Sequence, residues 1–201
     1  MLNRLNWANR VTLARMVFIP VFLVILLGRM PTWGPWLAAL VFTMLAATDA
    51  VDGYLARSRN EVTTFGKLID PLADKLLVTA ALVALVDLGK LPAWIAIVIV
   101  SRELIVSGLR MVAVAEGRVI AASSYGKVKT VLQICAIVGF IVKDSPLLET
   151  YAGATAAAAF TWLAWTVMAI ALLATIASML DYFYHARDII TGPWSEPETR
   201  A

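Results

Sequence analysis

Residues 151–180 read YAGATAAAAFTWLAWTVMAIALLATIASML, a stretch without a single charged residue. A helix needs roughly 20 consecutive apolar residues to cross a bilayer, so this stretch predicts a membrane-spanning helix. The whole chain shares its character, because 61% of the 201 residues are hydrophobic and only 15% are charged. Ordinary soluble domains contain roughly 45–50% apolar and 25% charged residues. The composition therefore excludes a soluble globular domain and a disordered chain.

Five more apolar segments precede this stretch, separated by polar loops and by Gly/Pro turns. We expect helices at about 7–28, from 36 into the Asp49 region, and at 66–88, 92–115 and 125–143. The sequence thus predicts an all-α, polytopic membrane protein with six transmembrane helices in one bundle over residues 1–190. A short interfacial segment at the N-terminus and a short cytoplasmic tail over 191–201 complete the prediction.

The distribution of basic residues predicts the orientation of these helices. With the N-terminus in the cytoplasm, the outer segments hold only Arg29, Lys90 and Lys143, which leaves 14 of the 17 Lys and Arg residues inside. Cytoplasmic loops are enriched in Lys and Arg, so we expect both termini in the cytoplasm. The net charge of +3 then fits basic loops facing anionic lipid better than nucleic acid. A single cysteine, Cys135, excludes an intramolecular disulfide.

Four aspartates are concentrated around one predicted cytoplasmic loop. Asp49 and Asp52 are three residues apart and Asp70 and Asp74 four apart, so each pair shares a helix face. The polar loop at 58–64 allows the two helices to run antiparallel and to bring all four carboxylates together. An aspartate inside a span costs about 2.5–3.5 kcal/mol, so four cost on the order of 10 kcal/mol. The cluster therefore requires cations.

Carboxylates without His or Cys favour Mg²⁺ or Mn²⁺ over zinc, and four of them can hold two ions of the kind used in phosphoryl chemistry. The small residues Gly53, Ala56 and Gly66 lie on the same faces and would let a flat or phosphorylated ligand approach the backbone. Arg57 could bind phosphate through two hydrogen bonds. The alternative is a solvated charge run in a loop, which two acidic pairs at helical spacing beside apolar spans disfavour.

The pattern Asp49-x₂-Asp52-Gly53-x₂-Ala56-Arg57-x₈-Gly66-x₃-Asp70-x₃-Asp74 resembles the signature of the CDP-alcohol phosphatidyltransferase family at every position. The resemblance implies a six-helix membrane enzyme, usually a homodimer, that displaces CMP from a CDP-linked lipid with an alcohol. It also implies site residues: metal ligands at Asp49, Asp52, Asp70 and Asp74, with Asp74 also the general base, and CDP-binding residues at Gly53, Ala56, Arg57 and Gly66.

An earlier element, Asn9-x₂-Thr12-x₂-Arg15, is similar to a motif near the start of the same family, although Ala8 stands where proline is usual. The resemblance adds Asn9 and Thr12 to the CDP-binding residues. A helix start capped by Asn9 explains the same pattern without a ligand.

Four cations further along the chain suit an anionic acceptor: Arg102, Arg110, Lys127 and Lys129. Two alternatives stay open, namely that the lysines are ordinary cytoplasmic loop charges and that Arg102 pairs with Glu103. Adjacent residues do not face each other on a helix, which disfavours the pair. These stretches and residues 178–187 resemble the branch of the family that makes phosphatidylglycerophosphate. That implies CDP-diacylglycerol as donor, glycerol 3-phosphate as acceptor, and an active site on the cytoplasmic face of a bacterial-type inner membrane.

Other functions fit parts of the pattern. The acceptor of the same chemistry could instead be inositol phosphate, serine or phosphatidylglycerol. A neutral or zwitterionic acceptor would not explain the four cations, whereas inositol phosphate would. A cation transporter would also need intramembrane acids. Transporters place such acids near the midplane on broken helices from two repeats, whereas this chain shows no visible repeat and its four clustered aspartates all lie beside one predicted cytoplasmic loop.

Overall fold

The computed structural model describes the backbone of residues 7–28, 30, 32–58, 64–115 and 125–190, and the side chains of 13–28, 30, 32–48, 75–109, 111 and 129–184. Within these ranges the chain forms six α-helices and no strand, which confirms the all-α prediction. The helices are α1 (Trp7–Leu27), α2 (Gly34–Ser58), α3 (Thr64–Asp87), α4 (Ala93–Ala115), α5 (Tyr125–Val142) and α6 (Pro146–Ile190). The predicted interfacial start at residues 1–6 and the tail at 191–201 lie outside the described residues.

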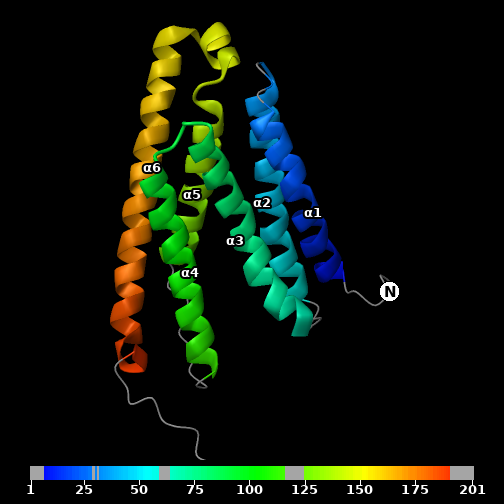
Figure 1. Cartoon of the computed structure of the whole chain (residues 1–201), viewed down its shortest axis with the longest axis vertical. Coiled ribbons are helices and arrows are strands. Elements are labelled where there is room, and N and C mark those ends of the chain that lie inside the picture. The colour runs from blue at the N-terminus through cyan, green and yellow to red at the C-terminus, as the bar shows by residue number, and fades with distance from the viewer. Residues whose placement is uncertain (1–6, 29, 31, 59–63, 116–124, 191–201) are drawn as a thin grey trace, which may run out of the picture.

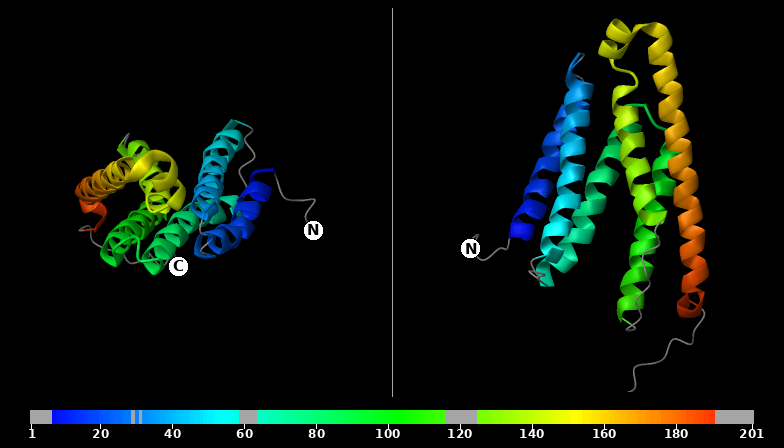
Figure 2. Two further views of the ribbon diagram at one scale, coloured as in Figure 1. Left: turned by 90° about the horizontal axis from the view of Figure 1, so that it is seen from above. Right: turned by 180° about the vertical axis from the view of Figure 1, so that it is seen from behind.

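The helices alternate in direction along the long axis of the molecule (Figure 1). In that view α2 ends and α3 begins at the lower end, where α1 and α5 also begin and α4 and α6 end. Helix α1 packs on α2 and α3, α5 lies between α2 and α6, and α6 also contacts α4 (Figures 1 and 2). This up-and-down order brings the acidic helix ends and the basic ends of α4 and α5 to the same end of the bundle.

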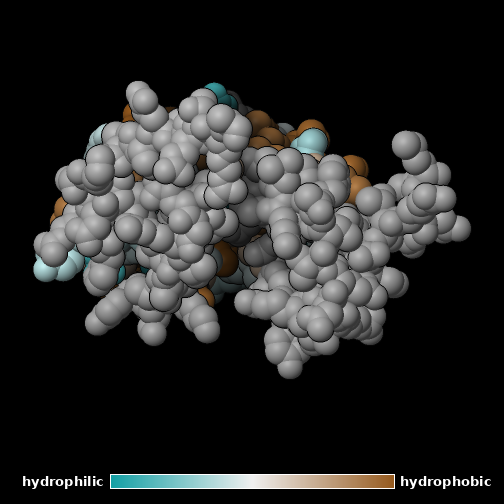
Figure 3. Space-filling view, turned by 90° about the horizontal axis from the view of Figure 1, so that it is seen from below, coloured by the Kyte–Doolittle hydropathy of each residue, from teal (hydrophilic) through white to brown (hydrophobic). Residues whose placement is uncertain are grey.

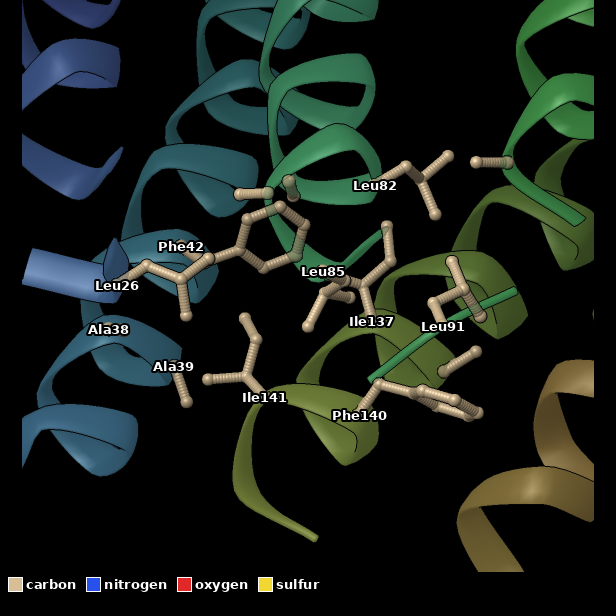
Figure 4. Packing of buried hydrophobic residues seen from close by; sticks show 14 of the residues in the cluster. Leu26, Ala38, Ala39, Phe42, Leu82, Leu85, Leu91, Ile137, Phe140 and Ile141 are labelled. Carbon is tan, nitrogen blue, oxygen red and sulfur yellow. The ribbon is translucent and has the colours of Figure 1, made fainter. Parts of the chain in front are cut away.

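The helices α1, α2, α3 and α5 meet in an apolar core in the upper half of the molecule. Figure 4 shows side chains from all four converging, with Phe42 of α2, Leu85 of α3 and Ile137 of α5 fully buried. Helices α5 and α6 also approach closely, because a Cβ atom built on Gly139 would lie 3.3 Å from the Cβ of Ala164. Small residues permit such contacts between helices, and dispersion attraction then holds the helices together.

Outside the core, every helix exposes large apolar side chains. One example from each helix in chain order is Val17, Leu40, Val83, Ile97, Val131 and Leu173, each at least 57% exposed. Seen from the lower end, brown apolar side chains lie along part of the periphery (Figure 3). Charged side chains are buried instead, among them Arg15, Arg102 and Lys129. Large apolar side chains at the exterior, together with buried charged residues, depart from the usual distribution of a soluble protein.

One helix in the described part of the chain, Pro146–Tyr184, is long and apolar enough to cross a membrane by length and composition. Three shorter apolar stretches are found at Leu13–Leu27, Gly34–Thr48 and Lys129–Val142. The number of helices is therefore confirmed, whereas the crossing of a membrane by all six stays a prediction.

The last helix differs from the prediction of 151–180, because it extends over Pro146–Ile190 with a break at Gly153. Gly153 adopts φ 82° and ψ 160°. A side chain would disfavour this positive φ, and glycine permits it. A short first segment thus turns into the long helix that covers α4 and α5 (Figure 1).

The upper end of the bundle is held together by polar contacts between loop residues and the ends of α2 and α5. Trp36 Nε1 donates to Ser145 Oγ at 2.9 Å, and Lys90 Nζ donates to the carbonyl of Ile141 at 3.1 Å. Asp144 lies 3.0 Å from Lys143 and 3.7 Å from Lys90. Burial lowers the pKa of Lys90, and the nearby Asp144 carboxylate opposes that shift. Two of the three cations assigned to the outer side therefore share one carboxylate.

Candidate active site

The acidic signature lies on the two helices that meet at the lower end of the bundle. The end of α2 carries Asp49, Asp52, Gly53, Ala56 and Arg57, and the start of α3 carries Gly66, Asp70 and Asp74. The antiparallel course of α2 and α3 agrees with the arrangement expected from the sequence (Figure 1). The side chains of these residues lie outside the described residues, so a cluster of four carboxylates stays a prediction. Elsewhere, among the described side chains, no group of three acids, histidines or cysteines could hold a metal ion.

The beginning of α1 reaches the same end of the bundle and contains Asn9 and Thr12. Their side chains are also outside the described residues, so a role in binding CDP stays a prediction. Arg15, the third residue of that element, is described and buried.

A buried cluster of charged residues joins α4 to α5. Glu103 on α4 accepts hydrogen bonds through Oε1 from both Lys129 Nζ of α5 and Arg102 Nη1, the latter at 3.1 Å. Lys129 is 3% and Arg102 8% exposed, so both cations are held in the interior of the bundle. One carboxylate against two cations leaves this triad with net positive charge. Buried charges are costly unless they are paired, which makes the triad a candidate site for an anion.

Helix α6 extends the cluster through Ser178. Arg102 Nη2 donates to Ser178 Oγ at 2.6 Å, so the two ends of the guanidinium contact different partners. One turn further along, Val106 of α4 and Tyr182 of α6 are buried against each other. Ser107 Oγ donates to the backbone carbonyl of Glu103 at 2.6 Å and reinforces this part of α4. Arg102 is therefore fixed between its own helix and α6.

A cleft opens beside the triad between α3, α4 and α5. It holds about 340 Å³ of empty space, its open mouth included, and is lined by Lys75, Val78, Glu103, Thr130, Gln133 and Ile134. The spacing of the α5 residues at i, i+3 and i+4 places them on one helix face. Lys75 adds a further positive charge that acts on both Glu103 and Lys129. The described wall of the cleft thus combines Lys75 and the triad residue Glu103 with two side chains that can hydrogen-bond to hydroxyls, Thr130 and Gln133.

The structure brings together two of the four cations that the sequence assigned to the acceptor, Arg102 and Lys129, through Glu103. The other two, Arg110 on α4 and Lys127 on α5, have side chains outside the described residues. The argument against an ion pair between Arg102 and Glu103 was wrong, because the long arginine side chain curls back to its neighbour at 3.1 Å.

Sequence reasoning missed the bridging role of Glu103 and the contribution of Ser178. An acidic residue within a set of four cations was the only signal for Glu103. No spacing connects Ser178 with Arg102, because 76 residues separate them.

Comparison with known proteins identifies the class to which this fold and site belong. A sequence model of the CDP-alcohol phosphatidyltransferases matches residues 5–186. The chain therefore belongs to the CDP-alcohol phosphatidyltransferase family and is an enzyme of that class. The match covers the first five helices, α6 as far as residue 186, and both halves of the acidic signature.

Three relatives show which members of the family this chain resembles in sequence. The chain is 45% identical over 152 residues to the CDP-diacylglycerol–glycerol-3-phosphate 3-phosphatidyltransferase of Bacillus subtilis, which covers 70% of this chain and 79% of that protein. It is 41% identical over 187 residues to a probable phosphatidylglycerophosphate synthase of Mycobacterium tuberculosis, covering 92% of this chain and 83% of the relative. It is 37% identical over 188 residues to the Escherichia coli CDP-diacylglycerol–glycerol-3-phosphate 3-phosphatidyltransferase, covering 90% and 95%.

Proposed function

We propose that this enzyme transfers the phosphatidyl group of CDP-diacylglycerol to sn-glycerol 3-phosphate and releases CMP. The relatives named above support this choice of substrates. The observation that carries the proposal is the buried triad of Arg102, Glu103 and Lys129, which has net positive charge beside a cleft. A phosphorylated acceptor would supply an anion to such a site.

The donor site lies at the junction of α2 and α3. Arg57 binds the diphosphate of CDP-diacylglycerol, and Gly53, Ala56 and Gly66 leave room for the nucleotide, with Asn9 and Thr12 completing the site. The donor set of four aspartates without His or Cys suits Mg²⁺ or Mn²⁺. Asp49, Asp52, Asp70 and Asp74 would hold two such ions, which would neutralise charge on the diphosphate.

The acceptor site lies in the cleft. Asp74 precedes the cleft residue Val78 by one helical turn on α3, so the two positions share a helix face. Arg102, Arg110, Lys127 and Lys129 bind the phosphate of glycerol 3-phosphate. Asp74 takes the proton of the 1-hydroxyl, whose oxygen attacks the phosphorus joined to diacylglycerol. A new P–O bond forms, the bond to CMP breaks, and CMP leaves with both electrons of that bond.

The surroundings of the site follow from its charge and from the apolar exterior. The six helices cross the bilayer, with both termini and the cleft at the cytoplasmic face, as the distribution of basic residues predicts. Apolar side chains exposed on every helix support contact with lipid. CDP-diacylglycerol then enters sideways from the inner leaflet. We also expect the homodimer that the family resemblance implies.

The test is release of CMP by the purified protein in detergent with CDP-diacylglycerol, Mg²⁺ and one acceptor at a time. The acceptors are glycerol 3-phosphate, inositol phosphate, serine and phosphatidylglycerol, each with a parallel EDTA sample. Chelator-sensitive release with glycerol 3-phosphate alone is the expected result. Release with inositol phosphate instead would keep the chemistry and overturn the acceptor. Release of CMP with serine would show that the positive charge of the triad does not select the acceptor.

A further inference from the structure

Among the described residues, Lys129 and Arg102 differ in how they are held. Lys129 donates to Glu103 alone, whereas Arg102 donates to Glu103 and also to Ser178 of α6. Lysine carries its charge on a flexible four-carbon chain, so a single partner decides where Nζ lies. Loss of Glu103 therefore releases Lys129 and leaves Arg102 anchored.

Glu103 also lines the cleft, and among the described residues of the cleft wall it is the one carboxylate. A carboxylate repels a phosphate, so an acid at this position works against acceptor binding unless it performs another task. Its contacts supply that task, because Arg102 and Lys129 both pair with its Oε1. The backbone at Glu103 is also bonded, since its carbonyl accepts a hydrogen bond from Ser107 Oγ at 2.6 Å.

We propose that Glu103 is a positioning residue, which aims Lys129 at the acceptor phosphate by pairing with it across the α4–α5 interface. The inference rests on the proposed function, because it takes the cleft as the acceptor site. Glu103 does not touch the reacting atoms. Glu103 fixes the Lys129 side chain before substrate binds, so less conformational entropy is lost when the phosphate binds.

The test measures KM and kcat for glycerol 3-phosphate and for CDP-diacylglycerol in Glu103→Gln, which keeps the size of the side chain and removes its charge. We expect the acceptor KM to rise roughly 10- to 100-fold, the range over which small misplacements act. The donor KM should change less than about twofold, because Lys129 binds only the acceptor. Glu103→Asp, which keeps the charge, should recover part of the loss. Thr166→Ala on α6 is the matched control, because its exposed hydroxyl bonds only within its own helix.

A double-mutant cycle with Lys129→Met distinguishes positioning from a direct contact. If Glu103 acts through Lys129, the double variant has the acceptor KM of Lys129→Met within about twofold. This comparison stands even if Glu103→Gln alone fails to fold, because the double variant leaves no unpaired lysine. An acceptor KM in the double variant far above that of Lys129→Met would overturn the proposal. A lower acceptor KM in Glu103→Gln would also overturn it, because that result is expected if Glu103 only repels the phosphate.

The two proposals fail in different ways. If Lys129→Met leaves the acceptor KM unchanged, the cleft is not the acceptor site and the proposed function loses its structural support. If Lys129→Met raises the acceptor KM and Glu103→Gln does not, the acceptor site stands and only the positioning role of Glu103 is refuted.

Discussion

Replacing Arg102 by lysine tests whether the contact between α4 and α6 depends on the shape of the guanidinium. Arg102 donates through Nη1 to Glu103 at 3.1 Å and through Nη2 to Ser178 at 2.6 Å. A lysine has one nitrogen at the end of its chain and no planar fork, so it cannot reproduce both contacts. It should remain on the carboxylate, which attracts it more strongly than a hydroxyl does, and abandon Ser178.

The expected cost is that of one hydrogen bond to a charged group, about 1.5–3 kcal/mol. The free energy of unfolding, measured by titration with SDS in mixed micelles, should fall by that amount in Arg102→Lys. Ser178→Ala removes the same bond from the other side and should cost about as much. The acceptor KM should rise moderately in both variants, because the cation at position 102 loses its anchor on α6.

The double variant tests whether Arg102 and Ser178 stabilise the protein through the same hydrogen bond. Because both changes remove one and the same bond, Arg102→Lys with Ser178→Ala should be no less stable than either variant alone. Thr166→Ala serves as the control on α6 and should leave stability within about 0.5 kcal/mol of the parent. Additive losses in the double variant would refute the reasoning, since they would mean that each residue acts through a different contact.

Three further predictions test packing, catalysis and metal dependence. Gly139→Leu should lower the unfolding temperature in detergent, because even a Cβ atom there would lie 3.3 Å from Ala164. The control Gly108→Ala should leave that temperature unchanged, because nothing lies within 4 Å of the added atom. Equal effects of the two variants would contradict the close approach of α5 and α6. Asp74→Asn should abolish CMP release while the protein still folds, as circular dichroism would show, and wild-type turnover would exclude Asp74 as the base. EDTA should stop CMP release and added Mg²⁺ should restore it, whereas full activity after exhaustive chelation would contradict the assignment of the aspartates.

The helices could be predicted from the sequence because their signals are local. Each helix needs a sufficient apolar run and a loop or turn at either end, and both are visible along the chain. The expected limits at 7–28, 66–88, 92–115 and 125–143 agree with the observed helices to within two residues. The sixth helix was predicted too short, since its break at Gly153 depends on a backbone conformation and its end extends past the apolar run.

The acidic signature could also be recognised locally, because its spacing follows the periodicity of two consecutive helices. Consecutive helices joined by a short loop run antiparallel, so the sequence already placed Asp49, Asp52, Asp70 and Asp74 at one end of the bundle. The same alternation brought the basic starts and ends of α4 and α5 to that end (Figure 1).

What the sequence by itself determined is therefore the set of helices, their alternation and the end at which the charges gather. Only the tertiary structure decided that Lys129 and Arg102 meet on Glu103 and that Ser178 holds the other end of Arg102. These partners are 26 and 76 residues apart. Whether such residues meet depends on how α4, α5 and α6 rotate and cross, and the packing of side chains between helices sets those angles. Local periodicity carries no information about them.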